Sequence, residues 1–271
     1  MRTSVVYTWL LLAWWTPLLG VEVKLYFPTG QEFLPSSWTR PPISAEIEPL
    51  NPKDEEFVSK VMTLAVKKYP GSLVDRHLRE IRVVGALRFY GVSYGGTYMA
   101  NSKRIVLVYR DSFDPVGFEQ RLHHEMSSIL LTENEGRFEK SRWVTANEPG
   151  FRYRAGGIIE EQKGDRSEAT KALEAEQRRT GGSGSSLLKL DEALMKQGFL
   201  TAYNRVSVEQ DVNELAAHLF TNGELWDLCV RFPRIDQKVD VLIDFYRGLD
   251  PRMDRIYFRN LTRTPQVLSG Q

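Results

Sequence analysis

The sequence predicts a single α+β domain that is mostly helical and carries a small antiparallel sheet. Helical periodicity with capping residues recurs along most of the chain. Residues 81–109 differ, because they are rich in Val, Ile and aromatic residues and contain turn signals at short spacing. A chain of 271 residues can bury a sizeable core, and no internal repeat divides it.

Residues 1–20 are predicted to lie outside the fold. Met1-Arg2 provides a short positive region, and an apolar run from Val5 to Trp15 follows. This pattern is typical of a secretory signal. The alternative is an uncleaved membrane anchor at residues 5–19, although that run is short for a membrane span. We therefore expect residues 21–271 to form an extracytoplasmic domain, secreted or periplasmic, that contacts a membrane only through such an anchor.

Composition excludes some classes of function. The chain has 36 basic and 35 acidic residues, a formal net charge of +1, and no long basic block. We therefore do not expect the protein to bind nucleic acid. Cys229 is the single cysteine, so an intramolecular disulfide and a cysteine zinc cluster are both excluded. Its apolar helical surroundings predict a small core residue rather than a nucleophile.

The elements of the first half have local signals. An irregular, extended segment is predicted at 21–50 from Pro28, Pro35, Pro41 and Pro42, and Asn51-Pro52 opens a helix that Pro70-Gly71 ends. The further elements expected here are a short helix at 73–80, a strand at 81–89, and a strand pair at 97–99 and 104–109 around a turn at 100–103.

The second half is predicted to be helical. Asp114-Pro115 is a good helix start, and Ser207-Val-Glu-Gln210 fits a capping box. The polar segment at 158–187 is interpreted as an insertion, either a solvated helix with a flexible Gly/Ser linker at 181–186 or a disordered surface loop. The expected helices are 114–132, 187–197, 208–221 and 235–248, with a loop at 133–157 held by Trp143, Phe151 and Tyr153.

The helix at 114–132 carries the main chemical motif, His123-His-Glu125, followed by Ser128. In a helical H-E-x-x-H pattern two imidazoles four residues apart hold one zinc ion, and the Glu takes a proton from the metal-bound water. Here His124 is the first predicted ligand and Glu125 the general base. Ser128 stands in place of the second His, and a neutral hydroxyl is a poor zinc ligand.

A second helix offers further ligands. Glu214 and His218 are four residues apart and share a face of the helix at 208–221. A Zn²⁺ site is therefore predicted from His124, Glu214 and His218, with His123 as the second choice for the third ligand. The simpler interpretation is that the Glu214–His218 pair only stabilises its helix. His77 is surrounded by charged residues and is predicted to be exposed.

The order of these motifs resembles gluzincin-type metallopeptidases. More closely, it resembles the zinc-binding metallopeptidases of bacterial extracytoplasmic proteins, in which a tract like Gly198-Phe-Leu-Thr-Ala-Tyr203 precedes an acidic helix. The resemblance covers roughly residues 80–225 and implies a zincin-like fold, with Glu214 as the carboxylate ligand. It also implies that Tyr203 hydrogen-bonds the tetrahedral intermediate and that the strand at 97–108 lines the substrate cleft. Ser128 departs from the pattern.

Two functions follow from the resemblance. The first is an extracytoplasmic zinc hydrolase that cleaves peptide bonds with Glu125 as base. The alternative is a catalytically inactive binding or scaffold protein on the same fold, without a stable metal, whose ligand is also a peptide or protein. A third interpretation is an unrelated secreted α+β protein with incidental histidines.

Overall fold

The computed structural model describes residues 23–110, 114–154, 170–172, 174–175, 178 and 188–263. The predicted signal segment at 1–20 and the linker at 181–186 lie outside the described residues. Within the polar insertion, the described residues at 170–172, 174–175 and 178 are helical. None of the helices in the described part of the chain has the length and apolar composition of a membrane span.

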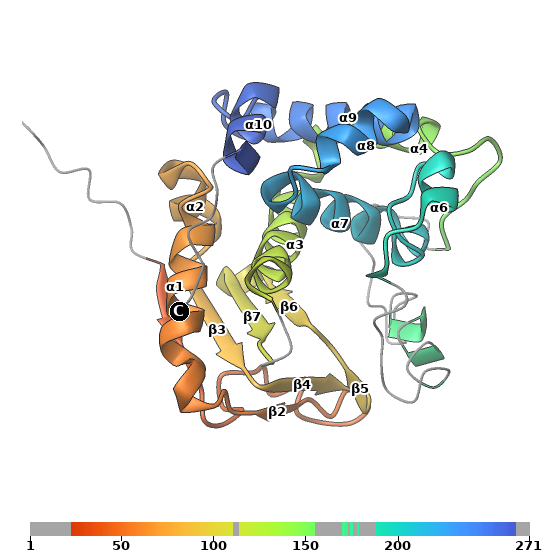
Figure 1. Cartoon of the computed structure of the whole chain (residues 1–271). Helices are drawn as coiled ribbons and strands as arrows, with labels where there is room; N and C mark the ends of the chain where they lie inside the picture. The colour runs from red at the N-terminus through yellow and green to blue at the C-terminus, as the bar shows by residue number, and fades with distance from the viewer. Residues whose placement is uncertain are drawn as a thin grey trace, which may run out of the picture.

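Helices predominate, which confirms the predicted α+β class (Figure 1). The helices are α1 (Glu55–Val66), α2 (Gly71–His77), α3 (Pro115–Glu133), α4 (Lys140–Thr145), α6 (Glu192–Gln197), α7 (Val208–Thr221), α8 (Leu225–Arg231), α9 (Pro233–Leu249) and α10 (Arg255–Arg263). The predicted helices near 55, 114, 187, 208 and 235 correspond to α1, α3, α6, α7 and α9. Helices α4, α8 and α10 were not predicted, because their segments are short or lack strong capping signals.

The larger sheet has four strands in the order β1-β3-β7-β6, so β6 is an edge strand. Its strands are β1 (Lys24–Tyr26), β3 (Glu80–Val84), β6 (Gly96–Met99) and β7 (Arg104–Val108). Strands β6 and β7 form the predicted antiparallel pair. The β1–β3 and β3–β7 pairs are parallel, so the sheet is mixed.

The smaller sheet is antiparallel, with the order β2-β4-β5, and its strands are β2 (Glu46–Glu48), β4 (Ala86–Phe89) and β5 (Val92–Ser93). The single strand predicted at 81–89 is therefore two strands, which belong to different sheets and are separated by Gly85. A Cβ at Gly85 would lie 2.6 Å from the Pro49 carbonyl oxygen. This close backbone approach explains why glycine stands where the chain leaves one sheet for the other.

Helix α3 occupies the centre of the fold, between the larger sheet and α7 (Figure 1). Successive side chains of β7 point to opposite faces of the sheet. Ile105 and Leu107 join the main core with the helices, whereas Val106 and Val108 join a second core against the smaller sheet. The first and second cavities described below lie where β6, α3 and α7 meet.

Two single-residue predictions have clear outcomes. Cys229 is buried in α8, which confirms its predicted place in the core. The prediction that His77 is exposed is wrong, since only 9% of it is accessible and its Nδ1 pairs with the Glu133 carboxylate at the end of α3. The charged neighbours of His77 in sequence gave no indication of this long-range partner.

Candidate functional site

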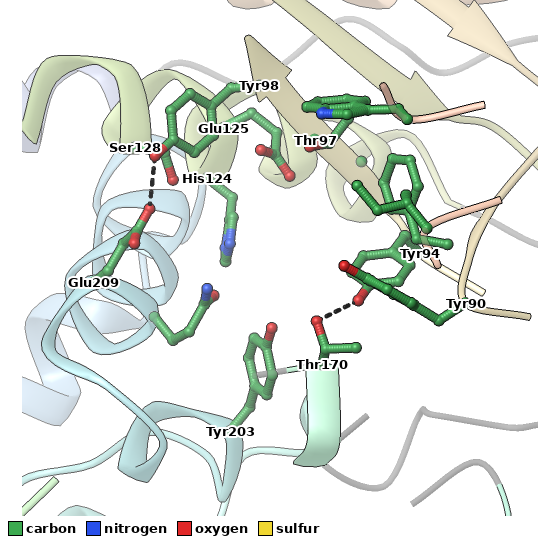
Figure 2. Close-up of a pocket in the computed structure, with 15 residues that line it drawn as sticks. Tyr90, Tyr94, Thr97, Tyr98, His124, Glu125, Ser128, Thr170, Tyr203 and Glu209 are labelled. Carbon is green, nitrogen blue, oxygen red and sulfur yellow. Dashed lines mark hydrogen bonds between the residues drawn. The ribbon is translucent and has the colours of Figure 1, made fainter. Parts of the chain in front are cut away.

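Helix α3 presents three predicted site residues to one cavity. Its N-terminus is fixed by Asp114, whose carboxylate accepts a hydrogen bond from the Gly117 N–H at 2.7 Å. His124, Glu125 and Ser128 all line this first cavity (Figure 2). The side chains of residues 124 and 128 project from one face of the helix, because they are four residues apart.

His123 lies away from this cavity, in the core. Its Nδ1 is 2.9 Å from the Tyr69 hydroxyl, its Nε2 is 3.0 Å from the Glu119 carboxylate, and its ring stacks on Phe220. Burial lowers its pKa, so the ring is neutral. We assign Nε2–H as the donor to Glu119 and Tyr69 as the donor to Nδ1. With both nitrogens engaged, His123 is not available as a ligand.

Helix α7 contributes its first turn to the first cavity. The Ser207 hydroxyl accepts a hydrogen bond from the Gln210 N–H at 3.2 Å, as the predicted cap requires. Glu209 and Gln210 then line the cavity together with His124. The side-chain amide of Gln210 interacts with the His124 imidazole.

The predicted partners Glu214 and His218 lie further along α7. Glu214 Oε1 is 3.8 Å from His124 Nδ1, which is longer than a hydrogen bond. His218 Nδ1 is instead 3.4 Å from the Asn222 amide nitrogen. Glu214 and His218 line a second cavity together with Arg121 and His124. The structure therefore brings His124 and Glu214 near each other. Within its described residues, no three His, Cys, Asp or Glu side chains are arranged to hold a metal ion.

The position of the missing ligand is occupied by an internal hydrogen bond. Ser128 is buried, and its hydroxyl oxygen accepts from the Asn213 side-chain amide at 2.5 Å. The two amide oxygens nearby on α7, Gln210 Oε1 and Asn213 Oδ1, are buried without a hydrogen-bond partner in the described part of the chain. Protein zinc sites use thiolate, imidazole and carboxylate donors rather than hydroxyls and amides. The residues present therefore do not fit a zinc site.

Glu125 is a strongly perturbed carboxyl group of the first cavity. Burial, followed by repulsion from Glu209, raises the pKa of its carboxyl from 4.5 to about 8, and attraction to Arg121 opposes this shift only in part. Figure 2 shows the carboxyl directed into the cavity. No hydrogen bond to it is formed by the residues that the structure describes.

Burial also dominates the other titratable groups nearby. It raises the pKa of Glu214 to about 7, against the opposing charge of Arg121. It lowers the pKa of His124 to about 4, where the positive charge of Arg121 acts in the same direction. Burial alone lowers the pKa of His218 to about 4. Both imidazoles are therefore neutral at physiological pH.

Tyr98 connects the edge strand β6 to the helices α3 and α7. Its hydroxyl is 3.3 Å from the Glu209 carboxylate on α7 and 3.1 Å from the Thr132 hydroxyl on α3 (Figure 2). Burial and the charge of Glu209 raise the pKa of Tyr98, so the phenol stays protonated and donates. This contact holds β6 against the mouth of the first cavity.

Three cavities follow β6 along its length. The first, of about 140 Å³, is lined by Gly96, Thr97 and Tyr98. The second, of about 300 Å³, shares Gly96 with it, and the third, of about 760 Å³, shares Thr97 and Tyr98 and continues to Met99. We call this run of cavities the β6 groove. The expectation that this strand lines a cleft agrees with the groove.

The backbone of β6 alternates between the sheet and the groove. The Val108 N–H donates to the Gly95 carbonyl at 2.9 Å, so residues 95 and 108 form a hydrogen-bonded pair. Because hydrogen-bonded pairs alternate along the strand, the backbone N–H and C=O groups of Thr97 and Met99 bond β7. The backbone groups of Gly96 and Tyr98 then point away from the sheet. These are the groups that an added strand would use.

Tyr203 lies on the far side of His124 from the strand. It is buried, belongs to the 3₁₀ turn Tyr203–Arg205 before α7, and lines both the first and second cavities (Figure 2). The role that the resemblance implies for Tyr203, a hydrogen bond to the tetrahedral intermediate, stays a prediction.

Sequence reasoning missed several residues of the site. The first cavity is lined by Glu209 and Gln210, and Asn213 bonds Ser128 beside it. The prediction named Glu214 instead, one turn after Gln210. A signal was present, because residues 210, 213 and 214 project from adjacent positions on α7. The aromatic wall of the first cavity, formed by Trp38, Phe89, Tyr90 and Tyr94, comes from segments that carry no motif.

The fold and site together define an α+β protein with a groove beside an edge strand and a His-Glu helix. No family model matches the chain, and no curated protein matches it. Among solved structures, the chain is similar to the crystal structure of a putative zinc-binding metallo-peptidase from Bacteroides caccae, with 13% sequence identity and a TM-score of 0.46. The likeness covers 89% of this chain and 85% of that one. A likeness of this degree does not assign an activity.

Proposed function

We propose that this protein is a non-catalytic, metallopeptidase-like binding protein that holds an extended peptide segment in the β6 groove. The observation that carries this proposal is the Asn213–Ser128 hydrogen bond, which fills the ligand position while the groove beside it remains open. The outward backbone groups of Gly96 and Tyr98 suit main-chain pairing with a ligand. The apolar run at residues 5–15 supports an extracytoplasmic location.

Zinc-dependent peptide hydrolysis with Glu125 as general base is the competing function. It needs a metal held by several N, O or S donors. His124 shares its two cavities with the carboxylates of Glu209 and Glu214, but no three His, Cys, Asp or Glu side chains among the described residues are arranged to hold a metal ion. Binding of about one equivalent of zinc by the purified protein, abolished by His124→Ala, would overturn our proposal.

The experiment measures binding of a random hexapeptide library to the immobilised full chain, with two variants at one position. Tyr98→Ala removes the ring and keeps the outward N–H, and Tyr98→Pro removes both. Proline is tolerated on an edge strand where the N–H does not bond the neighbouring strand. We expect Tyr98→Pro to lose at least about tenfold more retained peptide than Tyr98→Ala, as a lost main-chain hydrogen bond of about 1.4 kcal/mol predicts.

Circular dichroism melting of both variants confirms that they fold. Equal retention by folded Ala and Pro variants would show that the peptide does not pair with β6. Absence of retained peptide on the unmodified protein would refute the proposed function itself.

A further inference from the structure

The first cavity has an aromatic wall that is fixed by its own packing. Trp38 meets Phe89 edge-on with ring centroids 5.4 Å apart, and Phe89 meets Tyr94 in the same manner at 5.0 Å. The Tyr94 hydroxyl donates to the Thr170 hydroxyl at 2.5 Å (Figure 2). These contacts keep the rings in place without a ligand. Aromatic rings arranged in this way attract organic cations through their negative faces.

The opposite wall is acidic. Glu125 is 9% exposed and Glu209 4% exposed, and both line the first cavity. Glu209 accepts a hydrogen bond from Tyr98, whereas the Glu125 carboxyl points into the cavity with no hydrogen-bond partner among the described residues. A buried carboxyl without such a partner is costly. A positively charged ligand group would remove that cost.

The charges around the two adjoining cavities do not balance. Glu125, Glu209 and Glu214 contribute three carboxyl groups, and Arg121 contributes one guanidinium, which lines the second cavity rather than the first. A cation in the first cavity would favour the ionised form of the two carboxyl groups that line it, Glu125 and Glu209.

Glycine at position 96 leaves the approach to Glu125 open. A Cβ at Gly96 would lie 2.9 Å from Glu125 Oε1 and 3.0 Å from the Val106 carbonyl oxygen. Because Gly96 also directs its backbone groups toward the groove, a peptide residue paired there can direct its side chain past Gly96 toward the carboxyl.

We propose that the first cavity is a specificity pocket for the cationic side chain, lysine or arginine, of a peptide bound along β6. This inference rests on the proposed peptide-binding function and adds the chemical class of the residue recognised. The aliphatic stem of the side chain packs on the wall formed by Trp38 and Phe89, and the charged end meets Glu125 and Glu209.

The test uses hexapeptide libraries with one fixed central residue, presented to the immobilised full chain. The fixed residue is lysine, arginine, norleucine or glutamate. Norleucine matches the lysine stem without its charge. We expect lysine and arginine libraries to be retained at least about tenfold more than norleucine, because only the cationic side chains gain a cation–π contact together with a carboxylate partner.

Matched variants locate the effect. Glu125→Gln and Glu209→Gln should each reduce the ratio of lysine to norleucine retention. Glu224→Gln, which removes an exposed carboxylate at the start of α8, should leave it unchanged. Equal retention of all libraries would overturn the cationic pocket and leave peptide binding in place, and preferential retention of glutamate or norleucine would do the same. Retention of no library would refute the peptide-binding function on which the pocket depends.

Discussion

Glu125→Gln should stabilise the protein, and by more at pH 7 than at pH 5. The carboxyl has a pKa of about 8 in the folded state against 4.5 in the unfolded chain. Because the folded pKa is raised, the unfolded state gains stability by ionising as pH rises from 4.5 through 8. Linkage gives a cost to the folded state of about 3 kcal/mol at pH 7, and of about 1 kcal/mol at pH 5. Glutamine has the same shape and cannot ionise, so it avoids this cost.

The assay is urea unfolding of the parent and variant at both pH values. Taking the difference between the two proteins at each pH cancels the contribution of Glu214, whose pKa is also raised. We expect the gain in unfolding free energy to be larger at pH 7 by about 2 kcal/mol. A gain that is equal at both values, or a loss at pH 7, would show that Glu125 is ionised and paired in the folded protein.

Three further predictions test the site and its support. Ser128→His with Gln210→Glu should convert the chain to one that binds about one equivalent of zinc, measured by metal analysis after dialysis, and failure to bind would show that the two positions do not converge. Glu119→Gln should cost about 3 kcal/mol at pH 7. Burial opposes ionisation of Glu119, but hydrogen bonds and charges from neighbouring side chains lower its pKa from 4.5 to about 2. Its contribution to the unfolding free energy is therefore lost as pH falls from 4.5 to about 2, which urea titrations at several pH values would measure. Lys238→Met should cost about 3–5 kcal/mol in the same assay because it leaves Asp211 buried without its ion-pair partner, and a neutral result would mean that Asp211 is protonated.

Helices α3 and α7 were predictable because their signals are local. Asp114 and Ser207 both cap the helices that follow them, as the residue types indicated. The turn between β6 and β7 was also a local signal. The parallel pairs β1–β3 and β3–β7 join segments distant in sequence, and no turn connects them. Their pairing is a tertiary property that no short window of sequence contains.

The candidate site divides in the same way. The spacing of His124, Glu125 and Ser128 placed all three on α3 beside one cavity, as expected. The residues of α7 that share this cavity depend on the rotation of α7 about its own axis against α3. That rotation brings Gln210 to His124 in the first cavity, whereas His218 meets His124 only as a co-lining residue of the second cavity. Sequence spacing within α7 fixes which residues share a face, but it does not fix which face meets α3.

The Asn213–Ser128 hydrogen bond and the apolar core together explain how α3 and α7 are held against each other. A structural metal contributes folding free energy where the core is too small to do so. Here α3 and α7 pack through a large apolar core, and the Asn213–Ser128 hydrogen bond joins the two helices at the point where a shared ion would. Removing that bond by Asn213→Ala should leave the helices packed. The packing of α3 against α7 therefore keeps the shape of the groove, which is the condition that the proposed binding function requires.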